Sequence, residues 1–143
     1  MIATARRLNA LQWRQLTMAA WLLPVIDVSL RARGYGATRE WLDAWATRSR
    51  HGSGPPATDG MPPECHWLAQ SVGIAARRSL WPTSCLRQAL ALRFLLARRG
   101  IETRLHIGVK SGREGFGAHA WVEYQGEILI GGEHATQIYT RLV

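Results

Sequence analysis

Residues 85–130 read CLRQALALRFLLARRGIETRLHIGVKSGREGFGAHAWVEYQGEILI and contain the clearest structural signals in the chain. The first part repeats apolar residues with the helical period, which predicts a helix over Cys85–Arg99. The arginines of its last turn complement the negative end of the helix dipole, and Gly100 is a typical C-terminal stop. The apolar face of this helix consists of Cys85, Ala89, Leu92 and Leu96.

After this helix the pattern changes to the alternation that is typical of strands. Residues 103–109 alternate apolar and polar side chains and predict a strand, and Lys110–Gly117 predicts a glycine-containing turn. Ala118–Tyr124 and Glu127–Ile130 predict two further strands, joined by a tight hairpin at Gln125-Gly126.

Two helices are predicted in the N-terminal part. Residues 4–23 carry leucines at roughly helical spacing, and we expect this helix to end before Pro24. The second helix, Thr38–Thr47, has Thr38 as its N-cap. It brings Trp41 and Trp45 onto one face, four residues apart, where packing in the core is the simplest role for them.

A proline- and glycine-rich segment divides the chain. Residues 51–63, HGSGPPATDGMPP, offer little to bury and predict a loop. We expect residues 1–50 to pack as a helical part on a core formed by residues 64–143. That core begins with a helix over Glu64–Arg78, and Pro82-Thr83-Ser84 then supplies a cap for the helix at Cys85. Because helices precede antiparallel strands, the order predicts an α+β fold.

Composition excludes several classes of protein. The chain has 143 residues, the size of one domain, and 47% hydrophobic with 20% charged residues is unlike disordered, collagen, coiled-coil or multi-pass membrane proteins. The 18 basic residues, all arginine except Lys110, give a net charge of +8 that would attract anionic partners. The arginines are spread in pairs, so neither a nucleic-acid partner nor a membrane is expected.

The N-terminal region and the two cysteines bear on the compartment. Leu16–Ile26 is apolar but contains Pro24, is followed at once by Asp27, and has no small-residue cleavage site after it. It is also too short to span a bilayer. We therefore expect a cytoplasmic protein in which Cys65 and Cys85 are both thiols.

Cys85 and His119 are the candidates for catalysis. A cysteine at a helix start is surrounded by backbone N–H groups that stabilise a thiolate, which is the nucleophilic form. His119 lies on a predicted strand, with Trp121 and Glu123 on the same face, and a histidine held on a strand suits a general base. Each residue alone is more simply a structural one, because cysteine is often buried and histidine often only hydrogen-bonded.

Other cysteines and histidines give weaker sites. Cys65 and His66 are adjacent on a predicted helix, so their side chains point about 100° apart and form a poor catalytic pair. Two cysteines with scattered histidines match no zinc spacing, so no metal is expected. His106 and His134 are expected to be structural or surface residues.

In combination, three motifs carry a family resemblance: Cys-Leu at a helix start, Arg-Arg-Gly-Ile leading into Leu-x-Ile-Gly-Val, and Ala-His-Ala-Trp-Val-Glu. Over about residues 65–143 the chain resembles the transglutaminase-like leader peptidases of lasso-peptide biosynthesis, the B proteins. The resemblance implies a papain-like cysteine protease fold, with no cofactor, that removes the leader from a ribosomally made precursor peptide. Cys85 would be the nucleophile and His119 the base.

The chain departs from the family where the third catalytic member is expected. The family's usual acidic residue falls at Gly131, and Glu133 is the nearest carboxylate that could orient His119. Glu123, the Gln137 amide and a backbone carbonyl remain alternatives.

The resemblance also implies partners, namely a separate leader-binding recognition protein and an ATP-dependent lasso cyclase. The N-terminal tryptophans could pack internally or form the docking surface for the recognition protein; they are Trp13, Trp21, Trp41 and Trp45. Two alternatives to a peptidase stay open. One is an acyltransferase of the same superfamily, and the other is a basic module that binds acidic peptide or nucleic acid and has Cys85 in its core.

Overall fold

The computed structural model describes residues 10–50, 62–78, 85–112, 115–130 and 140–141. Helices precede strands along the chain, as the sequence predicts for an α+β fold. The elements are α2 (Ala10–Arg48), α3 (Pro63–Arg77), α4 (Cys85–Arg98), β1 (Arg104–Gly112), β2 (Gly115–Tyr124), β3 (Glu127–Ile130) and β4 (Thr140–Arg141). The strands form one antiparallel sheet in the order β3-β2-β1-β4. None of the described helices has the length and apolar character that a membrane crossing requires.

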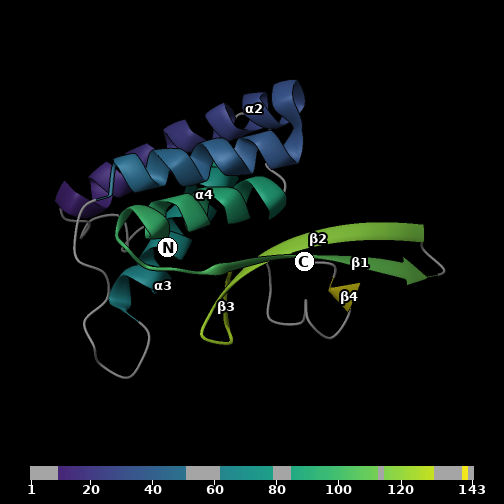
Figure 1. The fold of residues 1–143 in the computed structure, drawn as a ribbon. Helices are drawn as coiled ribbons and strands as arrows, with labels where there is room; N and C mark the ends of the chain where they lie inside the picture. The colour runs from purple at the N-terminus through teal and green to yellow at the C-terminus, as the bar shows by residue number, and fades with distance from the viewer. Residues whose placement is uncertain (1–9, 51–61, 79–84, 113–114, 131–139, 142–143) are drawn as a thin grey trace.

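Helices α2 and α4 lie in layers above the sheet (Figure 1). Helix α4 lies between α2 and the sheet: it packs against α2 on one side and against β1 and β2 on the other. Helix α3 packs beside α4 under α2 and reaches β3. One continuous core joins these layers, and its largest fully buried members include Leu23, Ile26, Leu68, Leu92, Leu96 and Val122.

Helix α2 does not end before Pro24, so that prediction is wrong. Pro24 lies inside the helix, where it removes one backbone hydrogen bond and costs about 3 kcal/mol. Leu22, Leu23 and Ile26 flank it and are fully or almost fully buried. Burial of each such side chain contributes about 1.5–3 kcal/mol, so the packing of this turn outweighs the penalty of the proline.

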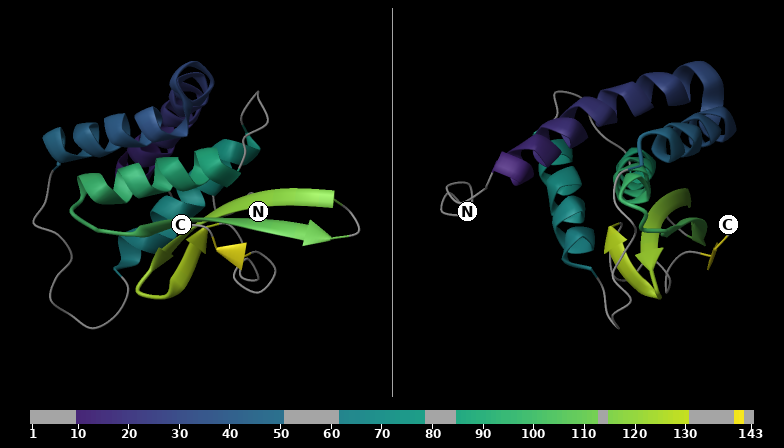
Figure 2. Two further views of the ribbon diagram at one scale, coloured as in Figure 1. Left: turned by 45° about the vertical axis from the view of Figure 1, so that its right-hand side comes forward. Right: turned by 60° about the vertical axis from the view of Figure 1, so that its left-hand side comes forward.

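The real break in α2 is at Gly34. Its backbone angles, φ 84° and ψ 178°, belong to a region that is essentially restricted to glycine, and the chain changes direction there (Figure 2). The Ser29 and Thr38 hydroxyl oxygens meet across this bend at 2.8 Å, and both residues are buried. Thr38 is therefore inside the second half of α2 and is not the predicted N-cap, because the helix restarts directly after Gly34.

Helix α4 confirms the prediction over Cys85–Arg99 to within one residue at its C-terminus. Gly100 has φ 78° and closes the helix: its N–H donates to the Ala97 carbonyl, and the Ile101 N–H donates to the Leu96 carbonyl. This pair of bonds is a Schellman motif, and the burial of Ile101 and Leu96 supplies its usual apolar contact. Helix α3 begins at Pro63, one residue before the predicted Glu64.

The sheet differs from the prediction mainly in its long hairpin. Strands β1 and β2 pair as far as Gly112 and Gly115, so most of the predicted turn Lys110–Gly117 belongs to the strands. Glycines are poor strand formers, and cross-strand pairing here overrides that local preference. The hairpin at Gln125-Gly126 is confirmed, with positive φ at both residues as a type I′ turn requires. Strand β4 was not predicted, because two residues give no alternation.

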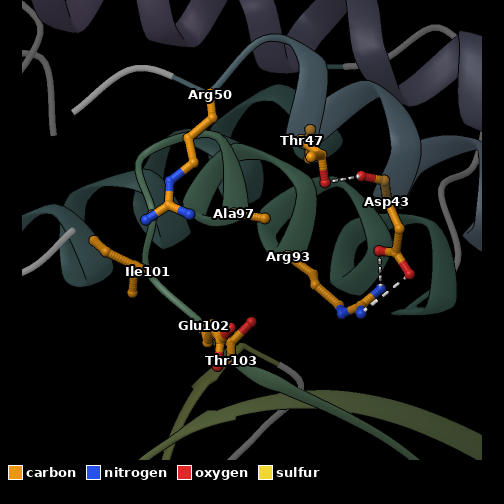
Figure 3. Close-up of a pocket in the computed structure, with 10 residues that line it drawn as sticks. Asp43, Thr47, Arg50, Arg93, Ala97, Ile101, Glu102 and Thr103 are labelled. Carbon is orange, nitrogen blue, oxygen red and sulfur yellow. Dashed lines mark hydrogen bonds and ion pairs between the residues drawn. The ribbon is translucent and has the colours of Figure 1, made fainter. Parts of the chain in front are cut away.

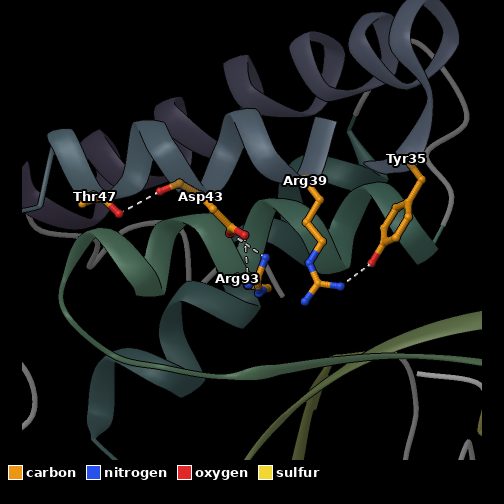
Figure 4. Close-up of polar contacts among 5 residues, drawn as sticks. All are labelled: Tyr35, Arg39, Asp43, Thr47 and Arg93. Atoms are coloured by element: carbon orange, nitrogen blue, oxygen red, sulfur yellow. Dashed lines mark hydrogen bonds and ion pairs between the residues drawn. The ribbon is translucent and has the colours of Figure 1, made fainter. Parts of the chain in front are cut away.

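Polar contacts tie α2 to α4 at two points. Near the end of α2, Arg93 of α4 donates to both carboxylate oxygens of Asp43, at 2.7 and 3.4 Å (Figure 4). Near the middle of α2, Asp27 pairs with Arg87, which lies in the first turn of α4. Because Asp27 is held by α2 and Arg87 is two residues after Cys85, this ion pair fixes the start of α4.

Candidate active site

Cys85 is the first residue of α4, and its side chain meets strand β2. The Ala120 backbone N–H donates to the Cys85 Sγ, with nitrogen and sulfur 3.4 Å apart. Ala120 directly follows His119, so the fold brings the start of α4 to the strand residue next to His119. Cys85 and His119 are both half-buried, which leaves part of each side chain accessible.

Strand register places His119 on a defined face of the sheet. Its partner on β1 is Gly108, and Trp121 is opposite His106. Side chains of directly opposed residues share a face, so His119, Trp121 and His106 lie on one side of the sheet. The other side carries Ala120 and Val122, which belong to the core beneath the helices.

Three other polar or aromatic side chains lie on the same face of the sheet as His119: Trp121, Glu123 and His106. The His119 and Trp121 rings are stacked, with centroids 6.2 Å apart and an interplanar angle of 22°. The Trp121 indole N–H donates to Glu123 Oε1 at 3.0 Å, and Glu123 Oε2 lies 3.2 Å from His106 Nε2. The Trp121 and His106 rings are also close, with centroids 5.6 Å apart. His106 is buried in this group, in agreement with the structural role expected for it.

The start of α4 combines the positive end of a helix dipole with Arg87, whose partner is Asp27. The first turn contains Arg87 and no acidic residue, so nothing on this described turn neutralises the positive end of the helix dipole. A thiolate is the nucleophile of cysteine enzymes.

The competing pair of Cys65 and His66 is separated by the fold. Cys65 has no exposed surface and lies in the core on α3, whereas His66 points outward and is exposed. Cys65 and Cys85 are both described, and no disulfide joins them, as the sequence predicts. Within the described ranges no three metal-binding side chains of the His, Cys, Asp or Glu type come together.

Several predicted residues lie outside the described residues. Glu133, Gly131, Gln137 and His134 belong to residues 131–139, so the structure does not test which group orients His119. The predicted cap Pro82-Thr83-Ser84 and most of the loop 51–63 also lie outside them. Of the alternatives, Glu123 is described, and the contacts given above direct its carboxylate at Trp121 and His106.

A cavity of about 420 Å³ lies at the other end of α4 and was not anticipated from the sequence (Figure 3). Arg50 and Arg93 point into it, together with Thr103 from the connection to β1. Cys85 is twelve helical residues before Ala97 of its lining, about 18 Å along the axis at 1.5 Å per residue. The cavity is therefore separate from the cysteine and histidine.

Arg98 lies on another side of the same helix end. Its guanidinium contacts Met18 Sδ at 2.8 Å and lies over the Phe94 ring. Burial, together with the nearby Arg14 and Arg99, lowers the pKa of Arg98. An arginine nevertheless stays charged at neutral pH, so this region is a basic surface remote from Cys85.

Comparison with known families identifies the class of protein. Residues 22–143 match the transglutaminase-like superfamily, and the chain therefore belongs to that superfamily. Its members generally use a cysteine for catalysis and include peptidases and acyltransferases. The match begins inside α2, so it extends well upstream of the segment that carries the sequence resemblance. Neither a curated protein nor a solved structure matches the chain.

Proposed function

We propose that the chain is a cysteine peptidase that removes the leader from a ribosomally synthesised lasso-peptide precursor. The observation that supports this proposal is the contact between Cys85 Sγ, at the start of α4, and the N–H of Ala120, the residue that follows His119 on β2. Membership of a superfamily that generally uses cysteine chemistry supports it. The narrower assignment to lasso-peptide precursors rests on the motif resemblance of residues 65–143.

The reaction follows from the two side chains. The Cys85 thiolate attacks the carbonyl carbon of the last leader residue, and N–H groups at the start of α4 are available to stabilise the oxyanion. His119 donates a proton to the departing amine of the core peptide as the C–N bond breaks, which leaves a thioester on Cys85. His119 then takes a proton from water, whose oxygen attacks the thioester and releases the leader carboxylate.

We propose Glu133 as the residue that orients His119, because it is the nearest carboxylate after the position that the family usually fills with an acid. A carboxylate on the second imidazole nitrogen fixes the tautomer and stabilises the imidazolium formed during the reaction. Glu133→Gln should lower turnover and leave the affinity for the peptide unchanged.

The proposed setting is cytoplasmic, with two protein partners. A recognition protein would bind the leader and present it to the peptidase, and an ATP-dependent cyclase would use the amine that cleavage exposes. Two of the four N-terminal tryptophans are suited to docking, since Trp13 and Trp21 are 52% and 72% exposed. The other two contact neighbouring rings: Trp41 contacts Trp45, which in turn contacts Phe94 of α4 while 37% of Trp45 stays exposed.

Mass spectrometry of a precursor peptide incubated with the chain tests the proposal, with and without a leader-binding recognition protein. We expect a free leader carboxylate and a free core amine, and no product with Cys85→Ala. A leader that carries the mass of an added amine would instead identify an acyltransferase. If the precursor stays intact in both mixtures and Cys85 resists alkylation at neutral pH, the proposal is wrong, and salt-sensitive binding of acidic peptide would then favour a binding module.

A further inference from the structure

Trp121 has no exposed surface, although it lies on the face of the sheet that carries the polar residues. Its indole faces two imidazole rings: His119 on the same strand at 6.2 Å and His106 on the opposite strand at 5.6 Å. The planes of Trp121 and His119 differ by only 22°. An aromatic face in this offset arrangement restricts rotation of the imidazole about its side-chain bonds.

The indole is itself fixed at its polar edge. Its N–H donates to Glu123 Oε1 at 3.0 Å, and the second carboxylate oxygen lies 3.2 Å from His106 Nε2. The side chains of Glu123 and His106 are only 12% and 8% exposed, so these contacts are made largely out of water. A hydrogen bond to a charged, shielded acceptor is stronger than one at the surface. The indole plane is therefore held from one side, and the His119 ring stacks on it.

We propose that Trp121 is a positioning residue for His119 and that Glu123 acts on this imidazole through the indole. This inference rests on the proposed function, because the orientation of His119 matters for rate only if His119 exchanges protons with the reacting atoms. Trp121 would do part of the work of orientation that a carboxylate does in a catalytic triad. A group misplaced by about 1 Å loses about 100-fold in rate, which sets the expected size of the effect.

The kinetic test uses p-nitrophenyl acetate as the probe and Cys85→Ala as the blank. In Trp121→Leu, kcat should fall about 100-fold with KM nearly unchanged, because the ester does not contact the indole. Trp121→Phe keeps an aromatic face and should recover at least about tenfold of that loss. Glu123→Gln keeps an acceptor for the indole N–H but removes its charge, so its kcat should fall less than that of Glu123→Ala.

Val122→Ala is the matched control for stability. Val122 is equally buried on the same strand but faces the core, so its truncation weakens the fold without touching the His119 face. It should lower the melting temperature and leave kcat unchanged. If Trp121→Leu and Val122→Ala reduce kcat equally at matched stability, Trp121 is only structural and the proposal is overturned.

Nitrogen NMR of the full chain measures the tautomer and the environment of the His119 imidazole directly. We expect one dominant tautomer and ring-current-shifted imidazole protons in the wild type, and mixed tautomers in Trp121→Leu. An unshifted His119 in the wild type, or the same tautomer ratio in both proteins, would overturn the proposal.

The kinetic and NMR experiments together distinguish failure of the positioning role from failure of the proposed function. Loss of kcat in Cys85→Ala but not in Trp121→Leu refutes positioning alone, whereas a positioned His119 in a protein without Cys85-dependent turnover refutes the proposed function alone.

Discussion

The chain contains two cysteine and histidine pairs, and the fold treats them in opposite ways. Cys65 and His66 are neighbours in sequence on α3, yet one is sealed in the core and the other points outward. Cys85 and His119 are far apart in sequence, yet the start of α4 meets β2 at the residue after His119. Both cysteines lie in the first turn of a helix. We therefore propose a nucleophile only at the helix start that contacts the histidine-bearing strand.

The largest expected effect is the loss of turnover in Cys85→Ala. We expect a fall of at least about 1,000-fold in precursor cleavage, because the other cysteine, Cys65, has no exposed surface and cannot replace it, and a comparable fall in His119→Ala. Cleavage followed by mass spectrometry measures it, with circular dichroism to show that both variants fold. Substantial cleavage by folded Cys85→Ala would contradict the proposal that Cys85 and His119, and not Cys65 and His66, are the catalytic pair.

Alkylation should separate the two thiols in one sample. Iodoacetamide should label native Cys85 about 100-fold faster than Cys65, because Cys65 reacts only after the core opens. Peptide mass spectrometry after timed quenching gives both rates. In denaturant the two rates should converge, and equal labelling of the native protein would contradict the difference in burial.

Gly34→Ala tests whether the bend in α2 affects only the stability of the fold or also the reactivity of Cys85. The substitution should lower the free energy of unfolding by about 1–3 kcal/mol, because φ 84° strains any side chain even though no atom lies within 4 Å of the added carbon. Gly36→Ala is the control: it also has open space but needs no positive φ, so it should be neutral or stabilising. Denaturant titration measures both variants. Loss of Cys85 reactivity in the folded fraction of Gly34→Ala would mean that the bend also shapes the site.

Cys65→Ala should give the smallest effect. It removes one buried sulfur from the core and should destabilise the protein by about 1 kcal/mol, with precursor cleavage unchanged per folded molecule. Thermal unfolding and the cleavage assay measure the two quantities. If Cys65→Ala folds but does not cleave the precursor, Cys65 takes part in the reaction and the choice of Cys85 as the nucleophile is contradicted.

Local signals predicted the parts of the fold that local interactions determine. Helix α4 and the turn at Gln125-Gly126 follow from apolar spacing, a C-terminal glycine and turn chemistry, and both are confirmed. Predictions failed where packing overrides local preference. Pro24 is tolerated inside α2 because buried side chains surround it, and the bend at Gly34 needs the Ser29 and Thr38 contact across it. Gly34 is a local signal that permits a bend, but the packing around Pro24 and the contact of Ser29 with Thr38 depend on residues farther apart.

The candidate site was only partly accessible to sequence. Strand alternation placed His119, Trp121 and Glu123 on one face, and the register confirms it. The alternation does not say which side chains on that face touch, so the indole between the imidazole and the carboxylate was not predicted. The contact of Cys85 with β2 depends on how α4 packs on the sheet. In the sequence, only the family resemblance indicates that Cys85 and His119 act together.

The most direct test of the pairing of Cys85 with His119 is the rate at which iodoacetamide alkylates Cys85 at pH 7 in three proteins: wild type, His119→Ala and His66→Ala. We expect His119→Ala to slow the reaction at least tenfold, since a neighbouring imidazole activates a thiol (about 1.4 kcal/mol per tenfold). We expect His66→Ala to match the wild type, because this exposed histidine is on α3. Equal rates in the wild type and His119→Ala would contradict the account.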